Sequence, residues 1–97
     1  MADNVHRMRP VLENEARVNI TWAGQNGDLP DPVHVDATDV EILAWATEAV
    51  RAGSVPGIAR DGGADFTGFV VDRFGSTDAR PYPLIQVRPK TPFGLGS

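Results

Sequence analysis

Residues 37–53 read ATDVEILAWATEAVRAG, and this stretch carries the signals of a complete helix, from its first residue to its last. Thr38 and Glu41 have the spacing of a capping box, in which each side chain accepts a hydrogen bond from the other residue's backbone N–H. Arg51 stands near the end, where a positive charge stabilises the helix dipole, and Gly53 follows as a left-handed stop. The sequence therefore predicts a helix over about 38–52.

The apolar residues of this helix recur at a period of 3.6, so they gather on one side, while charged and polar residues take the other. The apolar side consists of Ile42, Leu43, Ala46, Ala49 and Val50, with Trp45 at its edge. A helix with one apolar side must bury that side against another layer. Alternating segments elsewhere in the chain indicate that this layer is a sheet.

Three segments alternate apolar and polar residues, which is typical of strands with one buried face. They are residues 17–22, 33–35 and 84–88. Between the first two, Asn26-Gly27 is a pair that often forms two-residue hairpin turns. A turn there would place Pro30 and Pro32 at paired positions, where proline has no N–H to donate. We therefore expect an antiparallel pair joined by a wide, proline-stiffened loop.

The segment 66–74, FTGFVVDRF, is compatible with two structures. Its aromatic residues and Val70 match helical spacing, whereas the β-branched pair after Phe69, the internal Gly68 and the shortness favour a strand. We favour the strand, which would be the third of four along the chain, and the helix remains the alternative.

The predicted order is strand, strand, helix, strand, strand. Within it, residues 33–58, VHVDATDVEILAWATEAVRAGSVPGI, resemble the second strand, helix and following loop of ubiquitin-like β-grasp domains. In that family an acidic residue ends the strand, a Thr/Ser-Asp pair caps the helix, and a Gly-x-x-Pro-type loop follows it. The resemblance implies an α+β domain over 16–93, with a four-stranded mixed sheet packed on one amphipathic helix. Residues 1–15 are expected to form a flexible leader, and residues 94–97 a flexible tail.

Two features depart from the family pattern. The first hairpin is long, and the loop 75–83 has no counterpart.

Conjugated members of the family end in Gly-Gly, whereas this sequence ends in Gly94, Leu95, Gly96 and Ser97. The diglycine at 62–63 lies inside the chain and is expected to be a loop. Conjugation through the tail is therefore not predicted, and Phe93 is the tail residue expected to dock on the domain.

Composition limits the classes of function. The 97 residues carry a net charge of −4, so no general positive field attracts nucleic acid. No apolar run is long enough to span a bilayer, and the first residues lack the apolar region of a secretory signal. We expect a small, soluble, acidic protein of the cytoplasm. The absence of cysteine excludes disulfides and thiol chemistry.

The densest polar cluster lies between residues 28 and 39 and contains four aspartates and one histidine. Such side chains can bind divalent metals, but these are spread over a strand, loops and a helix start, which favours a solvated edge. The cluster consists of Asp28, Asp31, His34, Asp36 and Asp39. No serine has a neighbouring histidine, and no phosphate-binding glycine pattern occurs. The sequence thus predicts no catalytic set and no cofactor.

The favoured function is a non-enzymatic protein-binding module that acts through its open sheet face, an edge strand or its long loops. Alternation sends six side chains away from the helix, and these are the candidate contact residues: Arg17, Asn19, Thr21, His34, Gln86 and Arg88. The partner would be a protein, and the chain itself a monomer or an assembly subunit. Trp22 and Trp45 are expected to pack together under the helix rather than to anchor a partner.

Two alternatives remain. The second hypothesis is a small structural or assembly subunit, of a virus particle or a larger complex, whose ends become ordered on contact with neighbours. The third is a metal-binding protein or a small enzyme.

Overall fold

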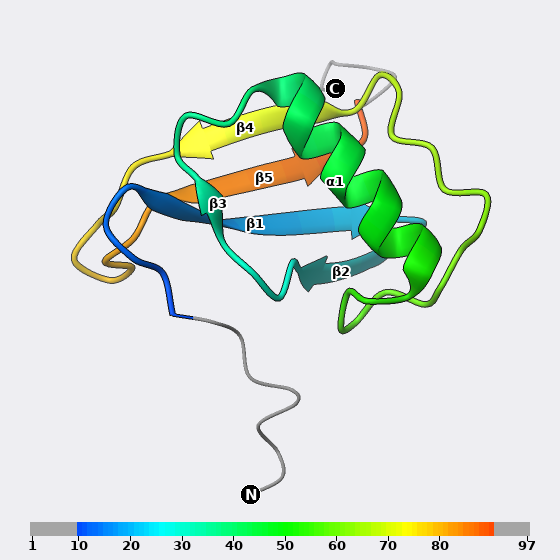
Figure 1. The fold of residues 1–97 in the computed structure, drawn as a ribbon, viewed down its shortest axis with the longest axis horizontal. Helices are drawn as coiled ribbons and strands as arrows, with labels where there is room; N and C mark the ends of the chain where they lie inside the picture. The colour runs from blue at the N-terminus through cyan, green and yellow to red at the C-terminus, as the bar shows by residue number, and fades with distance from the viewer. Residues whose placement is uncertain (1–9, 91–97) are drawn as a thin grey trace, which may run out of the picture.

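A computed structural model describes residues 10–90, and it shows a mixed β-sheet with one helix lying across it (Figure 1). Along the chain the elements are β1 (Glu15–Trp22), β2 (Gln25–Asp28), β3 (Val33–His34), α1 (Asp39–Ala52), β4 (Val70–Phe74) and β5 (Leu84–Arg88). The predicted α+β class, with one helix packed on a mixed sheet, is confirmed.

The sheet has the strand order β2-β1-β5-β4, and β3 pairs with the beginning of β1. Its two central strands, β1 and β5, run parallel, whereas all other pairs are antiparallel. Helix α1 crosses one face of this sheet, as Figure 1 shows. This arrangement is compatible with a β-grasp topology, and β2 is a fifth strand in addition to the predicted four.

Helix α1 begins and ends where its sequence signals lie. The Thr38 hydroxyl accepts a hydrogen bond from the Glu41 backbone N–H at 3.1 Å, and the Glu41 carboxylate accepts one from the Thr38 N–H at 2.9 Å. Gly53 adopts the left-handed conformation at φ 73°, and its N–H reaches back to carbonyls of the last turn. Both predicted caps are confirmed.

The first hairpin differs from its prediction. Strand β1 turns directly into β2 through Ala23-Gly24, whose φ angles of 52° and 79° match a tight hairpin turn. Asn26 and Gly27, expected near the turn or in a wide loop, are instead paired residues of β2. The predicted second strand does pair antiparallel with β1, but only through Val33 and His34.

The segment 66–74 divides into two parts. Val70–Phe74 forms strand β4, which confirms the favoured strand over the helix. Residues before it form a turn in which Phe66 is 1% exposed and Phe69 lies beside it, with ring centroids 4.7 Å apart. The helical spacing of the aromatic residues therefore comes from a turn that buries Phe66 and is followed by a strand.

The start of the domain also differs from expectation. β1 begins at Glu15, and a hydrogen-bonded turn precedes it, because the Glu15 N–H donates to the Leu12 carbonyl at 3.0 Å. Structure thus extends into the last residues of the predicted flexible leader. The predictions for residues 1–9, the tail 94–97 and Phe93 lie outside the described residues.

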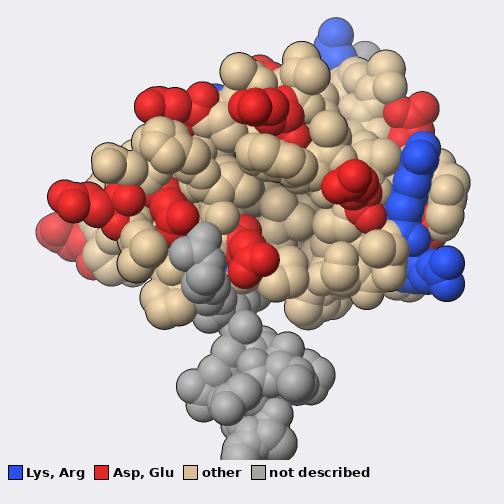
Figure 2. Space-filling model, viewed as in Figure 1, with Lys and Arg blue, Asp and Glu red and all other residues tan. Residues whose placement is uncertain are grey.

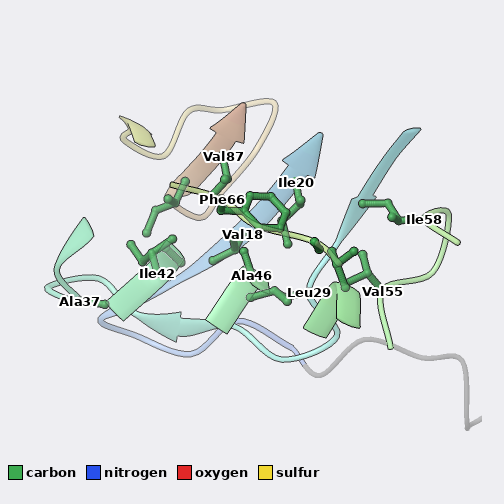
Figure 3. Packing of buried hydrophobic residues seen from close by; sticks show 14 residues of the cluster. Val18, Ile20, Leu29, Ala37, Ile42, Ala46, Val55, Ile58, Phe66 and Val87 are labelled. Atoms are coloured by element: carbon green, nitrogen blue, oxygen red, sulfur yellow. The ribbon is translucent and has the colours of Figure 1, made fainter. Parts of the chain in front are cut away.

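The core lies between α1 and the covered face of the sheet (Figure 3). Each layer contributes fully buried aliphatic side chains, and Phe66 lies among them near Val18, Ile20 and Val87 (Figure 3). The main contributors are Val18 and Ile20 from β1, Ile85 and Val87 from β5, and Ile42, Ala46 and Val50 from α1. Burial of these apolar side chains is the main stabilising contribution to such a fold.

Candidate functional sites

The open sheet face is the side of the sheet opposite α1. In the pairing register, Asn19 lies beside Asp28 on β2 and beside Gln86 on β5, and Arg88 lies beside Val70 on β4. Directly paired residues project to the same side of a sheet, so the side chains that alternate with the core share this face. Of the predicted contact residues, Asn19, Thr21, Gln86 and Arg88 come together there.

A polar network fixes one half of the open sheet face. The Asn19 side-chain amide donates to Asn26 Oδ1 at 2.9 Å and to Asp28 Oδ1 at 2.7 Å. Asn26 in turn donates to the Thr21 hydroxyl at 3.0 Å. These four side chains therefore hold one another in place across β1 and β2.

The other half of the open sheet face combines an ion pair with apolar side chains. Arg88 Nε donates to Asp72 Oδ2 at 2.6 Å, which links β5 to β4. Phe74 is 45% exposed at the end of β4, and Leu84 is its paired residue on β5. The face thus offers hydrogen-bonding groups along its middle and an apolar area at one end.

The other two predicted contact residues, Arg17 and His34, are not part of this group. Arg17 is only 9% exposed, and its Nη1 donates to the Pro30 carbonyl at 3.4 Å, so it connects β1 to the loop after β2. Arg17 lies on the predicted side of β1 but is buried, which leaves it little surface for a partner, because alternation gives the face of a side chain but not what covers it. His34 is exposed on β3, opposite Glu15, and its Nδ1 accepts from the Asp36 N–H at 3.1 Å.

The two outer edges of the sheet differ in their cover. Along β2, the Gln25 side chain accepts a hydrogen bond from the Ala59 N–H at 2.5 Å, and Pro56 lies against Gly27. The loop after α1 therefore protects that edge. Strand β4 ends the strand order, and within residues 10–90 no strand pairs along its outer edge. Of the two, β4 is the candidate edge for pairing with a partner's strand.

A groove that the sequence did not predict lies between α1 and the loop from β2 to β3. We call it the Trp45 groove. It has a volume of about 440 Å³ and is lined by Leu29, Pro30, Asp31, Pro32, Val33, Trp45, Ala49 and Ser54. A second hollow shares Trp45, Ala49 and Ser54 with it and adds Glu48. In the view of Figure 2 the surface over the middle of the molecule is mostly uncharged, with acidic side chains beside it and lysine or arginine side chains at the right.

The two tryptophans have different surroundings. Trp22 lies against Phe66 and Phe69, with ring centroids 4.8 Å and 5.6 Å away, and its Nε1 donates to Asp61 at 2.9 Å. Trp45 is 38% exposed and forms a wall of the groove. A tryptophan at the edge of the apolar side of a helix was the sequence signal for this groove. The loop residues opposite it could not be located from sequence.

The polar cluster at residues 28–39 is divided among separate contacts. Asp39 pairs with Arg73 at 2.6 Å, Asp28 accepts from Asn19, and His34 lies 3.8 Å from Asp36. Within the described part of the chain, no group of three or more histidine, aspartate or glutamate side chains is placed to hold a metal ion.

Two aspartates outside that cluster have lowered pKa values. The hydrogen bond from the Trp22 indole, followed by that from the Gly63 N–H, lowers the pKa of Asp61. Hydrogen bonds from the Thr67 hydroxyl and N–H lower the pKa of Asp65. Each carboxylate is therefore stabilised in its charged form by local donors, as in structural turns.

Over residues 10–90, no helix has the length and apolar character needed to cross a membrane.

Comparison with known proteins adds no named relative. The chain matches no protein-family model, no curated protein and no solved structure.

Proposed function

We propose that this protein is a non-enzymatic protein-binding module with a ubiquitin-like β-grasp fold, and that it contacts its partner through the open sheet face. One observation carries the proposal: the described helix covers only one side of the sheet, and four strands align hydrogen-bonding side chains on the other. The contact residues are Asn19, Thr21, Gln86 and Arg88.

The fixed geometry of this face supports binding. Asn19 and Arg88 are already held by hydrogen bonds to neighbouring strands, so they lose little conformational freedom when a partner arrives. Gln86 lies between them in the sheet and presents both a donor and an acceptor. The exposed ring of Phe74 adds an apolar contact at the end of the same face. Mixed polar and apolar surfaces of this kind are typical of protein interfaces.

The proposal is tested by site-specific crosslinking. A photoreactive amino acid replaces Gln86 on the open sheet face, and a control chain carries it at Ala44, which is exposed on α1. Both chains are irradiated in cells that express the protein. The open-face position is expected to give a discrete crosslinked protein that the Ala44 position does not give.

A second measurement separates binding from proximity. With the crosslinked partner purified, Gln86→Arg should weaken binding about tenfold or more, because a long charged side chain disrupts a flat interface. The midpoint of thermal unfolding should stay the same. Equal crosslinking from both positions, or unchanged affinity in Gln86→Arg, would contradict the proposal. A crosslink to a second copy of the chain would instead support the assembly subunit.

A further inference from the structure

The Trp45 groove has rigid walls. One wall is α1, whose two ends are capped. The other is the loop from β2 to β3, which the main chain holds at one end because the Leu29 N–H donates to the Val18 carbonyl at 2.9 Å. Arg17 holds the same loop through the Pro30 carbonyl, and Pro30 and Pro32 have restricted backbones. The groove is therefore formed before any ligand arrives.

The charged side chains that line the groove, among the described residues, have one sign. The lining of the groove and the adjoining hollow includes two carboxylates, Asp31 and Glu48, and within residues 10–90 no lysine or arginine. Asp31 also takes part in a separate interaction, so Glu48 is the carboxylate with which a ligand would pair. Glu48 lies three positions after Trp45 on α1, which places both on the same side of the helix. Cationic groups are therefore attracted to this surface, and anionic groups are repelled.

The hydrogen-bonding groups of the loop point to the same ligand chemistry. Pro30 and Pro32 have no backbone N–H, so this wall presents few hydrogen-bond donors to a ligand. The half-exposed Trp45 ring offers an aromatic face, which attracts cations through its quadrupole. Leu29, Val33 and Ala49 supply the apolar surface between these groups.

Only two natural side chains combine a long apolar stem with a cationic head, namely arginine and lysine. We propose that the Trp45 groove binds an arginine or lysine side chain carried by a linear segment of a partner protein. The stem lies along Leu29 and Ala49, the head lies against the Trp45 ring, and its N–H groups donate to Glu48. This inference rests on the proposed protein-binding function but uses a different surface.

The test uses three synthetic peptides, acetyl-Gly-Ala-Leu-X-Leu-Ala-Gly-amide, with arginine, glutamine or glutamate at X. Each is titrated into the full isotope-labelled chain and followed by NMR. The arginine peptide should shift the Trp45 indole N–H and the amides of Val33 and Ala49 in a saturable manner. The glutamine peptide should bind about tenfold more weakly, because it lacks the charge. The glutamate peptide should not bind. Added salt should lower the affinity of the arginine peptide, because it screens the attraction between the opposite charges.

Matched variants of the protein test whether Glu48 is the carboxylate that pairs with the arginine of the peptide. Glu48→Gln should lower the affinity for the arginine peptide about three- to tenfold, since one charge-assisted hydrogen bond is lost. Asp78→Asn removes an exposed aspartate from the loop between β4 and β5 and should change nothing. Gln86→Arg on the open sheet face should leave peptide binding intact, so failure of either proposal can be recognised separately.

Several results would overturn the inference: equal binding of the glutamate peptide, equal loss in Asp78→Asn, absence of saturable shifts, or shifts on the open sheet face instead. Two further results would assign the groove to another occupant. Groove resonances that change when the chain is shortened to begin at Pro10 would assign it to residues 1–9. Groove resonances that depend on protein concentration without peptide would assign it to a second copy.

Discussion

At the scale of single residues, Asp61 shows how one carboxylate connects distant parts of the chain. It accepts the Trp22 indole N–H at 2.9 Å, and its other oxygen accepts the Gly63 N–H at 2.9 Å. These donors lower its pKa in the folded state. A group with a depressed folded pKa contributes stability above its unfolded pKa, and this contribution is lost as pH falls through the folded value.

We therefore predict a change in acid sensitivity in Asp61→Asn. The difference in urea midpoint between the native chain and the variant should be largest at neutral pH and should shrink below about pH 4, where the free carboxylate begins to take up protons. In the native chain, the Trp22 indole N–H resonance should move over the same range. Asp78→Asn serves as the control for loss of a negative charge, and a midpoint difference that does not vary with pH would contradict the prediction.

The sequence predicted features that depend on neighbouring residues, such as helix caps, better than features that depend on contacts between distant segments. Thr38, Glu41 and Gly53 act within a few positions of themselves, so their roles as helix caps followed directly from the sequence. Arg17 and Trp45 depend on a loop that arrives from elsewhere. Alternation placed Arg17 on the right side of its strand, but the nearby Pro30 carbonyl, and hence the burial of Arg17, could not be inferred.

At the scale of elements, the first hairpin shows two local signals in competition. Asn26-Gly27 is the stronger turn pair, but the chain turns at Ala23-Gly24. The earlier turn brings Asn26 beside Thr21 and Gly27 beside Ile20. Because Gly27 has no side chain, the loop after α1 can approach it closely at Pro56. Strand β2, Gln25–Asp28, is polar and four residues long, so nothing in its composition indicated a strand.

The loop after α1 packs against the edge of β2 at Gly27, and this contact leads to a prediction. A Cβ atom at this position would overlap the Pro56 carbonyl oxygen and lie 3.0 Å from Val55 Cγ1. Gly27→Ala should therefore lower the free energy of unfolding by about 2 kcal/mol or more, because backbone must shift to admit the methyl group. Chemical denaturation followed by tryptophan fluorescence measures this change.

Gly62→Ala is the matched control, because a Cβ there meets nothing within 4 Å. Its free energy of unfolding should stay within about 0.5 kcal/mol of the native value. If the two variants unfolded at the same denaturant concentration, the loop 54–59 would not rest against β2 as described.

At the scale of the whole molecule, stability should follow position in the sheet. β1 and β5 have neighbours on both sides, whereas β3 consists of two residues paired only to the start of β1. Native-state hydrogen exchange should therefore find the slowest amides in β1 and β5 and the fastest strand amides in β3. Equal protection of His34 and Val87 would contradict this order.

The general architecture was accessible from sequence, because one strongly amphipathic helix and alternating segments leave few ways to bury the apolar surface. The sites were less accessible. Four of six predicted contact residues share the open sheet face because they alternate with core residues, which is a local property. The Trp45 groove joins residues 29–33 to α1, so its existence depends on the fold itself.

The parallel contact between β1 and β5 has a consequence for how the protein is made. Strand β1 has its central partner about 70 positions later in the chain, at Leu84–Arg88. Until that segment emerges, the core side of β1 lacks Ile85 and Val87, and its hydrogen-bonding edge is open. During synthesis the growing chain therefore exposes a strand edge and apolar surface that chaperones recognise.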